Sequence, residues 1–331
     1  MSEARYDVIA IGNAIVDVMA PCSDELIEEF GMARGAMTLV DERQAAELYD
    51  AMGPAREISG GSAANTLAGL SALGAQCAFI GQVADDQLGA VFAHDIHAVG
   101  IDFDTPPRQG EPSTARCLIF VTPDGQRTMH TFLGASQFLP ASALDEEAIG
   151  GASILYLEGY LWDPEEPRAA MRRAIATARD AGRKVALTLS DAFVIARHGD
   201  DFRALLAEGM IDILFANEAE LTAMTGSDDF EAGIAQIAPQ VPVLVVTRSE
   251  KGAVALSGGE RAEVPAEPVE QVIDTTGAGD LFAAGFLFGY ARERDLETCL
   301  RIGAVAAAEV ISHYGARPEA DLKALVESRA G

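Results

Sequence analysis

Short apolar segments alternate with helical patterns along most of this 331-residue chain, and this alternation restricts the possible folds more than any other feature. Buried strands are indicated at residues 6–11, 76–81, 153–158, 184–189, 211–215 and 242–247. Helices are indicated at residues 62–73, 165–181, 217–224, 278–291 and 295–313. Strands that alternate with helices form parallel sheets covered on both faces, so the sequence predicts an α/β fold. Such sheets bind ligands beyond the carboxyl ends of their strands.

One region departs from this pattern. Residues 113–133 alternate apolar and polar side chains around Pro123-Asp124-Gly125-Gln126, which indicates a hairpin. Residues 34–40, just before a helix capped by Asp41, could join it in a small sheet. We expect residues 34–40 and 113–138 to form a lid within a single domain, residues 1–331; a plain edge hairpin is the alternative.

Charge and composition exclude several classes of partner. Lys and Arg number 24 against 51 Asp and Glu, a net charge of −27, which disfavours nucleic acids and anionic membranes. None of the three lysines lies in a P-loop motif. Cys22, Cys77, Cys117 and Cys299 are widely spaced, as in reduced cytosolic proteins. Without a signal peptide or a spanning segment, the protein is expected to be soluble and cytoplasmic.

Residues 273–286 give the clearest indication of chemistry, with the sequence Ile-Asp-Thr-Thr-Gly-Ala-Gly-Asp-Leu-Phe-Ala-Ala-Gly-Phe. Gly277, Ala278 and Gly279 are expected at a helix N-terminus, where free N–H groups and the helix dipole favour phosphate. Asp280, in the first turn, could accept a proton from a hydroxyl that attacks this phosphate. An isolated Gly-x-Gly-Asp is usually a capped turn, but the preceding threonines and the close-packed helix that follows favour phosphoryl transfer.

Two segments nearer the N-terminus indicate a substrate side. In residues 58–66, Gly61 allows close backbone approach at a helix entry, and Asn65 offers a donor and an acceptor to a polyhydroxylated ligand. In residues 12–17, Asp17 is expected where the first strand ends, and its carboxylate could accept two hydrogen bonds from a vicinal diol. Taken alone, the first segment could be a helix cap and the second a turn aspartate.

In this order, the motifs resemble those of the ribokinase-like carbohydrate kinases, also called the phosphofructokinase B family. Residues 60–74 are similar to the N-terminal signature of that family and residues 274–286 to its C-terminal signature. Residues 217–220 resemble its Asn-x-x-Glu motif, although alone they would indicate a capping box. The resemblance covers nearly the whole chain and is strongest to the adenosine kinase branch. It implies a three-layer fold with a mostly parallel central sheet, helices on both faces and a small β lid.

The resemblance also implies roles for individual residues. Asp280 would be the catalytic base, and Gly277, Ala278 and Gly279 the anion hole. The substrate would be bound by Asn13, Asp17, Gly61 and Asn65, the last three at ribose hydroxyls. Apolar walls around a purine would come from Ile15, Leu39, Phe132, Leu161 and Phe193, with Met37 where the branch has a glutamine; core packing is the alternative for the two phenylalanines.

The implied cofactors are ATP, Mg²⁺ and a monovalent cation such as K⁺. ATP would contact Asn217, Thr247, Gly252, Gly277 and Gly279. Asn217 and Glu220 would hold Mg²⁺ through water, and Val243–Gly252 resembles the strand and turn that lead to the nucleotide. The monovalent cation would lie near Asp274, Thr276 and residues 308–316.

The function implied is an ATP-dependent kinase that acts on the 5′-hydroxyl of a nucleoside, with adenosine as the expected acceptor, in a monomer or homodimer. A sugar kinase for ribose, fructose or a related sugar is the alternative within the family. A silent nucleotide- or sugar-binding regulator is the alternative of another class, and the intact Asp280 with both glycines argues against it. A dinucleotide-dependent oxidoreductase is excluded, because no Gly-x-Gly-x-x-Gly follows the first strand.

Overall fold

The computed structural model describes residues 4–330, which form one large sheet, one small sheet and the helices around them. The strands of the large sheet are β1 (Tyr6–Ile11), β5 (Cys77–Ile80), β6 (Ile101–Asp102), β9 (Ala152–Glu158), β10 (Lys184–Thr188), β11 (Ile213–Asn217), β12 (Val243–Thr247), β13 (Ala253–Ser257) and β14 (Glu260–Val264). The strands of the small sheet are β2 (Ile15–Pro21), β3 (Met37–Leu39), β4 (Arg56–Gly60), β7 (Ala115–Val121) and β8 (Arg127–Phe132).

Helices connect most of these strands. The α-helices are α1 (Asp24–Glu29), α2 (Glu42–Ala51), α3 (Ser62–Ala72), α4 (Gln87–Ala98), α5 (Glu146–Gly151), α6 (Glu165–Asp180), α7 (Ala192–Ala207), α8 (Glu218–Thr225), α9 (Phe230–Ile237), α10 (Ala278–Tyr290), α11 (Leu296–Val310) and α12 (Leu322–Arg329). The short 3₁₀ helices are η1 (Gly134–Gln137), η2 (Ala141–Ala143), η3 (Gly159–Trp162), η4 (Ala238–Gln240) and η5 (Ser249–Lys251).

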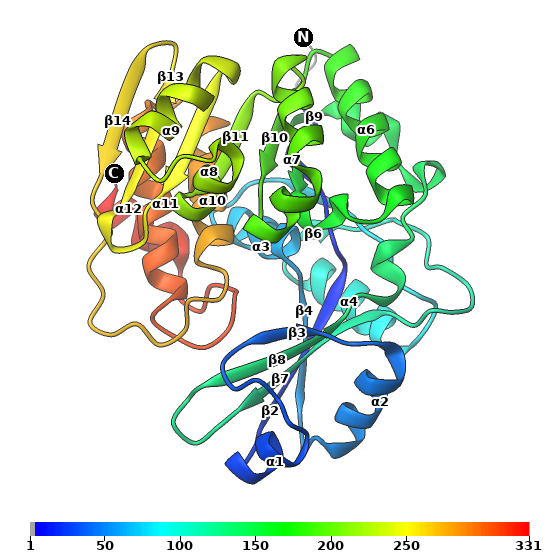
Figure 1. Ribbon diagram of the computed structural model, residues 1–331. Helices are drawn as coiled ribbons and strands as arrows, with labels where there is room; N and C mark the ends of the chain where they lie inside the picture. Colours follow the sequence, from blue (N-terminus) through cyan, green and yellow to red (C-terminus); the bar gives the residue numbers. More distant parts are fainter. Residues whose placement is uncertain (1–3, 331) are drawn as a thin grey trace.

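The large sheet is parallel except at one edge, as the alternation of strands and helices predicts. Its strand order is β14-β13-β12-β11-β10-β9-β1-β5-β6, and only β13 and β14 run antiparallel to their neighbours. Strand β1 pairs on one side with β5 and on the other with β9. The carboxyl ends of the parallel strands therefore lie along one edge of the sheet, which is the edge that faces the small sheet in Figure 1.

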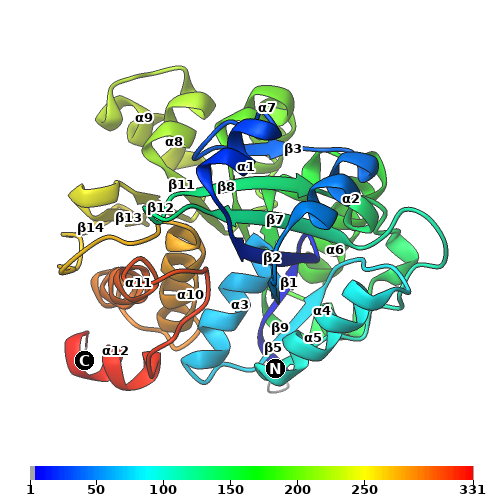
Figure 2. The same ribbon diagram turned by 90° about the horizontal axis from the view of Figure 1, so that it is seen from below.

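Helices cover both faces of the large sheet, because alternate residues of its strands point to opposite sides. Val8 and Ala10 of β1 belong to the core against α3, α10 and α11, whereas Ile9 and Ile11 belong to the core against α5, α6 and α7. Figure 2 shows these two helical layers, with α3, α10 and α11 on one side and α6 and α7 on the other. Burying each large aliphatic side chain contributes about 1.5–3 kcal/mol.

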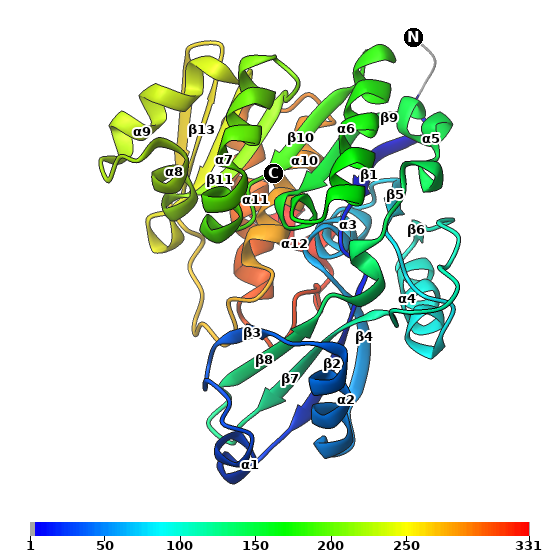
Figure 3. The same cartoon turned by 45° about the vertical axis from the view of Figure 1, so that its right-hand side comes forward.

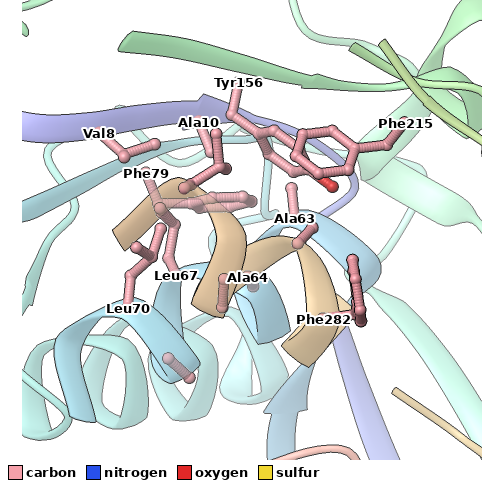
Figure 4. Close-up of a cluster of buried hydrophobic side chains, with 14 of the residues drawn as sticks. Val8, Ala10, Ala63, Ala64, Leu67, Leu70, Phe79, Tyr156, Phe215 and Phe282 are labelled. Atoms are coloured by element: carbon pink, nitrogen blue, oxygen red, sulfur yellow. The ribbon is translucent and has the colours of Figure 1, made fainter. Parts of the chain in front are cut away.

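Aromatic side chains fill the core on the α3 and α10 side. Tyr156 on β9 and Phe215 on β11 contact each other edge to face, with their ring centroids 6.2 Å apart. Figure 4 shows them above the small residues Ala63 and Ala64 of α3. Small residues on α3 let this helix lie close under the strands, which brings its N-terminus to the carboxyl edge of the sheet.

The small sheet projects from the main body and presents one face to it (Figures 1 and 3). Its strand order is β3-β8-β7-β2-β4, and the hairpin β7–β8 turns at the Pro-Asp-Gly segment that the sequence indicated. On β2, Val16 and Val18 are buried in the core that contains Ile27 of α1 and Leu48 of α2. Ile15, Asp17 and Met19 alternate with these valines and point to the opposite face.

Several expectations need adjustment. Asp17 lies within β2, not at the end of a strand of the large sheet, because the chain enters the small sheet directly after Gly12-Asn13-Ala14. The sequence analysis assigned neither β2 nor β4; the expected lid segments supply only β3, β7 and β8. The strand expected at 211–215 lies at Ile213–Asn217, and the helix expected to reach 313 ends at Val310. In residues 4–330, no helix is long and apolar enough to cross a membrane.

Candidate active site

A cavity of about 400 Å³ lies at the carboxyl edge of the large sheet and is bordered by the small sheet. The main body contributes the N-termini of α3, α8 and α10, and the small sheet contributes alternate residues of β2, β7 and β8. Twelve residues selected from the sequence line this cavity: Ile15, Asp17, Gly61, Asn65, Asn217, Glu220, Thr247, Thr276, Gly277, Ala278, Gly279 and Asp280.

The N-terminus of α10 is built as an anion-binding site. Its N-cap, Gly277, has a φ of 79° and makes no side-chain capping hydrogen bond. A Cβ at Gly277 would lie 2.7 Å from the Cβ of Ala316, so both the backbone angle and the space require glycine. A Cβ at Gly279 would meet no atom within 4 Å, so this residue faces open space. The N–H of Ala278 donates to the backbone oxygen of Thr275 at 3.2 Å, whereas no hydrogen bond within residues 4–330 engages the N–H of Gly277 or Gly279, so these two remain available to an oxyanion from the cavity.

The N-terminus of α3 has the same construction. Its N-cap, Gly61, has a φ of 96° and makes no side-chain capping hydrogen bond. A Cβ there would lie 2.2 Å from the backbone oxygen of Asn13. Of the twelve α-helices in the described part of the chain, only α3, α6 and α10 lack a side-chain hydrogen bond at the N-cap. Two of these three exposed helix termini meet at the cavity.

The carboxylate of Asp280 joins these two helices. Its Oδ1 accepts a hydrogen bond of 2.6 Å from the hydroxyl of Ser62, and its Oδ2 accepts one of 3.3 Å from the amide nitrogen of Asn65. Burial raises the pKa of Asp280 to about 6, although the hydrogen bonds from Ser62 and Asn65 favour the ionised form. The carboxylate is thus ionised at neutral pH and basic enough to accept a proton.

Asp17 lies on the opposite wall of the same cavity. Burial raises its pKa to about 6, against the lowering effect of the positive charges on Arg317 and Arg127. A second cavity of about 270 Å³ adjoins the first, and both are lined by Asp17, Asn65, Ile119 and Thr276. The guanidinium of Arg317 lines this second cavity, and two of its nitrogens are buried without a hydrogen-bond partner among the described residues.

Asn13 supports the site instead of lining it. Its backbone N–H and its side-chain amide both donate to Oε1 of Glu158, at 2.6 Å each, and its side-chain oxygen accepts from Ser136. The other oxygen of Glu158 accepts from the N–H of Ala63 at 2.8 Å. Burial raises the pKa of Glu158 to about 7, against the hydrogen bonds to its ionised form. This network holds the β1–β2 connection against α3. Asn13, which was expected to contact the substrate, does not line the cavity.

Asn217 and Glu220 form a capping box at the start of α8. The side chain of Asn217 accepts from the N–H of Glu220 at 2.8 Å, and the side chain of Glu220 accepts from the N–H of Asn217 at 3.1 Å. Burial, with the nearby charge of Asp191, raises the pKa of Glu220 to about 7. Among the described residues this destabilised carboxylate forms no ion pair, which suits the outer shell of a divalent cation.

The residues expected around a purine are dispersed. Leu161 is fully buried in the core beneath η3, and Phe132 is buried beside Arg116, so neither lines the cavity. Both side chains pack in the hydrophobic core, Phe132 with the small-sheet and α3 residues and Leu161 with those of α6 and α7. Met37, Leu39 and Phe193 are exposed by 52%, 58% and 75%, and they lie outside the cavity wall.

The remaining expected residues have structural partners. Gly252 has a φ of 90°, and a Cβ there would lie 2.0 Å from the backbone oxygen of Val264, so glycine is required by the turn before β13. The carboxylate of Asp274 accepts from Thr276 and forms an ion pair with Arg127. Within residues 4–330, no group of three His, Cys, Asp or Glu side chains could hold a metal ion.

Two sets of lining residues were not expected: the cavity-facing side chains of β7 and β8, and residues 317–319 that follow the C-terminal loop. The alternation of apolar and polar side chains on the hairpin indicated that one set of residues would share a face. Which face meets the cavity depends on the register with β2, a strand that the sequence pattern did not indicate. The lining residues missed in the larger cavity are Ser62, Cys117, Ile119, Met129, Thr131, Tyr160, Thr188, Ser190, Phe215, Ala216, Thr275 and Phe282.

Comparison with known proteins agrees with this geometry. Residues 33–322 match the model of the pfkB family of carbohydrate kinases. The chain belongs to this family. The crystal structure of adenosine kinase from Sinorhizobium meliloti has 47% sequence identity and a TM-score of 0.90, and the match covers 98% of this chain and 99% of that one. The ribokinase-like fold expected from the motifs is thereby confirmed.

Other relatives in the pfkB family have names that refer to sugars. The structure of a probable sugar kinase protein from Rhizobium etli CFN 42 has 44% identity and a TM-score of 0.91, with 98% of each chain covered. A fructokinase from Klebsiella pneumoniae is 31% identical over 251 residues, which are 74% of this chain and 80% of that protein. Family membership therefore establishes a pfkB-family kinase but leaves its acceptor open.

Proposed function

We propose that this pfkB-family kinase transfers the γ-phosphate of ATP to the 5′-hydroxyl of adenosine. The observation that carries the proposal is the position of Asp280. Its carboxylate stands in the first turn of α10, beside an uncapped helix N-terminus, in a cavity that also contains Asp17 and Asn65. A base, an anion site and groups that bind hydroxyls are the parts that phosphoryl transfer to an alcohol requires.

Asp280 acts on the attacking hydroxyl. Ser62 and Asn65 hold its carboxylate in place through hydrogen bonds, so that it accepts the hydroxyl proton as the bond to phosphorus forms. The N–H groups of Gly277 and Gly279 bind the oxygens of the transferred phosphoryl group, while that of Ala278 donates to the backbone oxygen of Thr275. Because the transition state is largely loose, alignment and charge neutralisation contribute more to the rate than the strength of the base.

Asp17, Gly61 and Asn65 orient the ribose. The side-chain oxygen of Asn65 is buried and has no hydrogen-bond partner among the described residues, so it is free to accept from a substrate hydroxyl. On the opposite wall of the cavity, the carboxylate of Asp17 can accept hydrogen bonds from two neighbouring hydroxyls of the ribose. A buried polar atom without a partner costs about 1–3 kcal/mol, which a ribose hydroxyl would recover at Asn65.

The small sheet supplies an apolar surface for the base. Cys117 and Ile119 of β7 and Met129 of β8 line the cavity. In the parallel pairing of β3 with β8, Met37 is the partner of Met129 and Leu39 that of Thr131, so both side chains extend this same face. They are exposed, as is Phe193 at the start of α7. Closure of the small sheet over a purine would bury these side chains and exclude water from the phosphate.

ATP occupies the part of the cavity near α8 and α10. Thr247, at the end of β12, and the first turn of α10 line this part, and Gly252 shapes the adjoining turn. When bound, Mg²⁺ would neutralise the phosphate oxygens, which a protein of net charge −27 cannot do with its bulk field. Asn217 and Glu220 would hold the metal through its water ligands.

A sugar or sugar derivative is the second candidate acceptor. The second cavity places Arg317 next to Asp17, and an acceptor with a polar or anionic group beyond its hydroxyls could use that guanidinium. The relative from Rhizobium etli, named as a probable sugar kinase, supports this alternative.

The acceptor is tested by measuring ADP release with a panel of nucleosides and free sugars. We expect kcat/KM for adenosine to exceed that for ribose and fructose by at least ~100-fold, about 2.7 kcal/mol in the transition state. Leu39→Ala and Phe193→Ala should lower kcat/KM for adenosine more than for ribose. Phe30→Ala is the matched control, because Phe30 is an exposed aromatic residue that lines neither cavity. Equal or better turnover of a sugar would establish the second candidate.

A further inference from the structure

The carboxylate of Asp274 is fully engaged by the protein itself. Its Oδ1 accepts from the backbone N–H of Thr276 at 3.0 Å and from the hydroxyl of Thr276 at 2.7 Å. Its Oδ2 accepts from the N–H of Gly315 at 3.0 Å and from the guanidinium of Arg127. A carboxylate offers about four acceptor positions, so no position remains for a further ligand.

The ion pair between Arg127 and Asp274 is buried and joins two parts of the molecule. The side chain of Arg127 is 7% exposed and that of Asp274 is 6% exposed. Arg127 belongs to β8 of the small sheet, whereas Asp274 stands three residues before Gly277, the N-cap of α10. The guanidinium also lies against the ring of Tyr314, which follows α11. The positive charge thus sits where the small sheet, the C-terminal loop and the anion site meet.

This arrangement does not fit the monovalent cation expected near Asp274 and Thr276. A hard cation needs several oxygen ligands, and the carboxylate that would contribute most is already saturated by N–H and O–H donors. A cation beside Asp274 would also face the positive charge of the Arg127 guanidinium. Two positive charges would then share one buried carboxylate.

We propose that the guanidinium of Arg127 takes the place of a monovalent cation at Asp274, so that turnover does not depend on such a cation. The proposal holds for either acceptor. Arg127 neutralises Asp274, and Asp274 in turn fixes the N–H and the hydroxyl of Thr276, directly before the N-cap of α10. Arg127 is therefore a positioning residue for the anion site, and its charge does the work that a bound ion would otherwise do.

The test compares the wild-type chain in KCl and in choline chloride at equal ionic strength. Both kcat/KM, from ADP release, and the thermal unfolding midpoint of the protein without nucleotide are measured. We expect less than about a twofold difference in kcat/KM and no shift of the midpoint, because coupling to a bound effector is typically 5-fold or more. An increase of more than about 5-fold in K⁺ would overturn the proposal.

Arg127→Gln provides the second arm of the test. Without the guanidinium, the buried carboxylate of Asp274 has no cationic partner, so K⁺ should raise both the unfolding midpoint and kcat/KM, the latter by at least about 5-fold. The double variant Arg127→Gln/Asp274→Asn should lose this response, because it has no charge to neutralise. Arg116→Gln is the matched control, since Arg116 lies on the neighbouring strand and forms no ion pair within residues 4–330.

The variants decide between two outcomes. A K⁺ response in Arg127→Gln that is absent from the double variant and from Arg116→Gln supports the proposal. If Arg127→Gln folds but shows no K⁺ response in either measurement, the proposal is contradicted. Asp274 would then bind no cation even without the guanidinium of Arg127. If Arg127→Gln does not fold, a K⁺ titration of the wild type still decides, since any saturable rise of its unfolding midpoint would reveal a bound ion.

Discussion

The N-termini of α8 and α10 face the same cavity but use their third residues in opposite ways. Glu220 is the third residue of α8, and its carboxylate folds back to the N–H of Asn217, the N-cap of the same helix. Asp280 is the third residue of α10, and its carboxylate reaches across to Ser62 and Asn65 of α3. Glutamate is longer than aspartate by one methylene group. The carboxylate of Glu220 bonds to the N-cap of its own helix, and that of Asp280 bonds to the neighbouring helix α3.

The absence of a side-chain cap costs α10 a small amount of helix stability. A side-chain cap stabilises a helix by about 0.5–2 kcal/mol, and α8 has one while α10 has none. The N-cap of α10 is a glycine with a positive φ, which contributes no side-chain cap and leaves the N–H of Gly279 without a partner among the described residues. Under the proposed function, the uncapped terminus of α10 binds an anion, whereas the terminus of α8 is closed by its own side chains.

The largest expected effect comes from removing the charge at the uncapped terminus. Asp280→Asn should lower kcat by ~10²–10⁴, because the amide cannot accept the proton of the attacking hydroxyl. ATP binding should change little, since the amide oxygen still accepts from Ser62. The measurements are ADP release and nucleotide affinity by calorimetry. If the variant kept more than half of the wild-type turnover, Asp280 would not be the base.

A smaller effect is expected when the anion site is narrowed. Gly279→Val places a branched side chain in the open space before the first-turn N–H groups, so kcat/KM for ATP should fall by about 10–100-fold, while acceptor binding changes less. Gly53→Val is the matched control, because Gly53 also has open space around its Cβ position and a φ outside the left-handed region. Unchanged ATP kinetics in Gly279→Val would place the phosphate elsewhere.

The sequence predicted the main sheet and the start of the helix that follows Gly277, because both depend on local patterns. Short buried strands and close-packed helices are visible as apolar runs, and Gly277 and Asp280 lie on one continuous segment. The same holds for the capping box, in which Asn217 and Glu220 are three residues apart. Local geometry therefore determines these features almost completely.

The small sheet could not be predicted to the same extent, because its face depends on pairing between distant segments. β2 pairs with β7 about a hundred residues later, and this register brings Cys117 level with Asp17. Arg127 and Asp274 are separated by 147 positions, so no local pattern joins them. Leu161 and Phe132, which the family resemblance placed around a purine, are buried in the hydrophobic core.

A substitution at the capped terminus of α8 should change the Mg²⁺ concentration that activity requires. It should leave the rate of proton transfer unchanged. Glu220→Gln keeps the capping box, because glutamine can make the same bond to the N-cap, but it removes the charge that faces the metal waters. We expect the Mg²⁺ concentration for half-maximal activity to rise several-fold, with kcat at saturating Mg²⁺ nearly unchanged. Glu218→Gln is the control, since Glu218 pairs with Arg248 and Lys251. An unchanged Mg²⁺ requirement in Glu220→Gln would separate Glu220 from the metal.

The smallest effect concerns stability, and it should be shared by both helix termini. The folded-state pKa is raised to about 6 for Asp280 and to about 7 for Glu220, against ordinary values of 3.8 and 4.5. Because the folded protein binds these protons more tightly than the unfolded chain, the stability they contribute is complete below pH about 4 and is lost as the pH rises through 6 to 7. At pH 8 each ionised carboxylate therefore destabilises the fold.

Asp280→Asn and Glu220→Gln should consequently each raise the free energy of unfolding at pH 8 by about 1–2 kcal/mol, since one pKa unit corresponds to about 1.4 kcal/mol and both carboxylates retain access to the cavity. The gain should shrink as the pH falls and disappear near pH 4, where the wild-type groups are protonated in both states. Urea unfolding between pH 4 and pH 8 measures it. A gain of equal size at pH 4 would show that the amides stabilise by packing, and a loss at pH 8 would show that the ionised acids are held by interactions stronger than their burial.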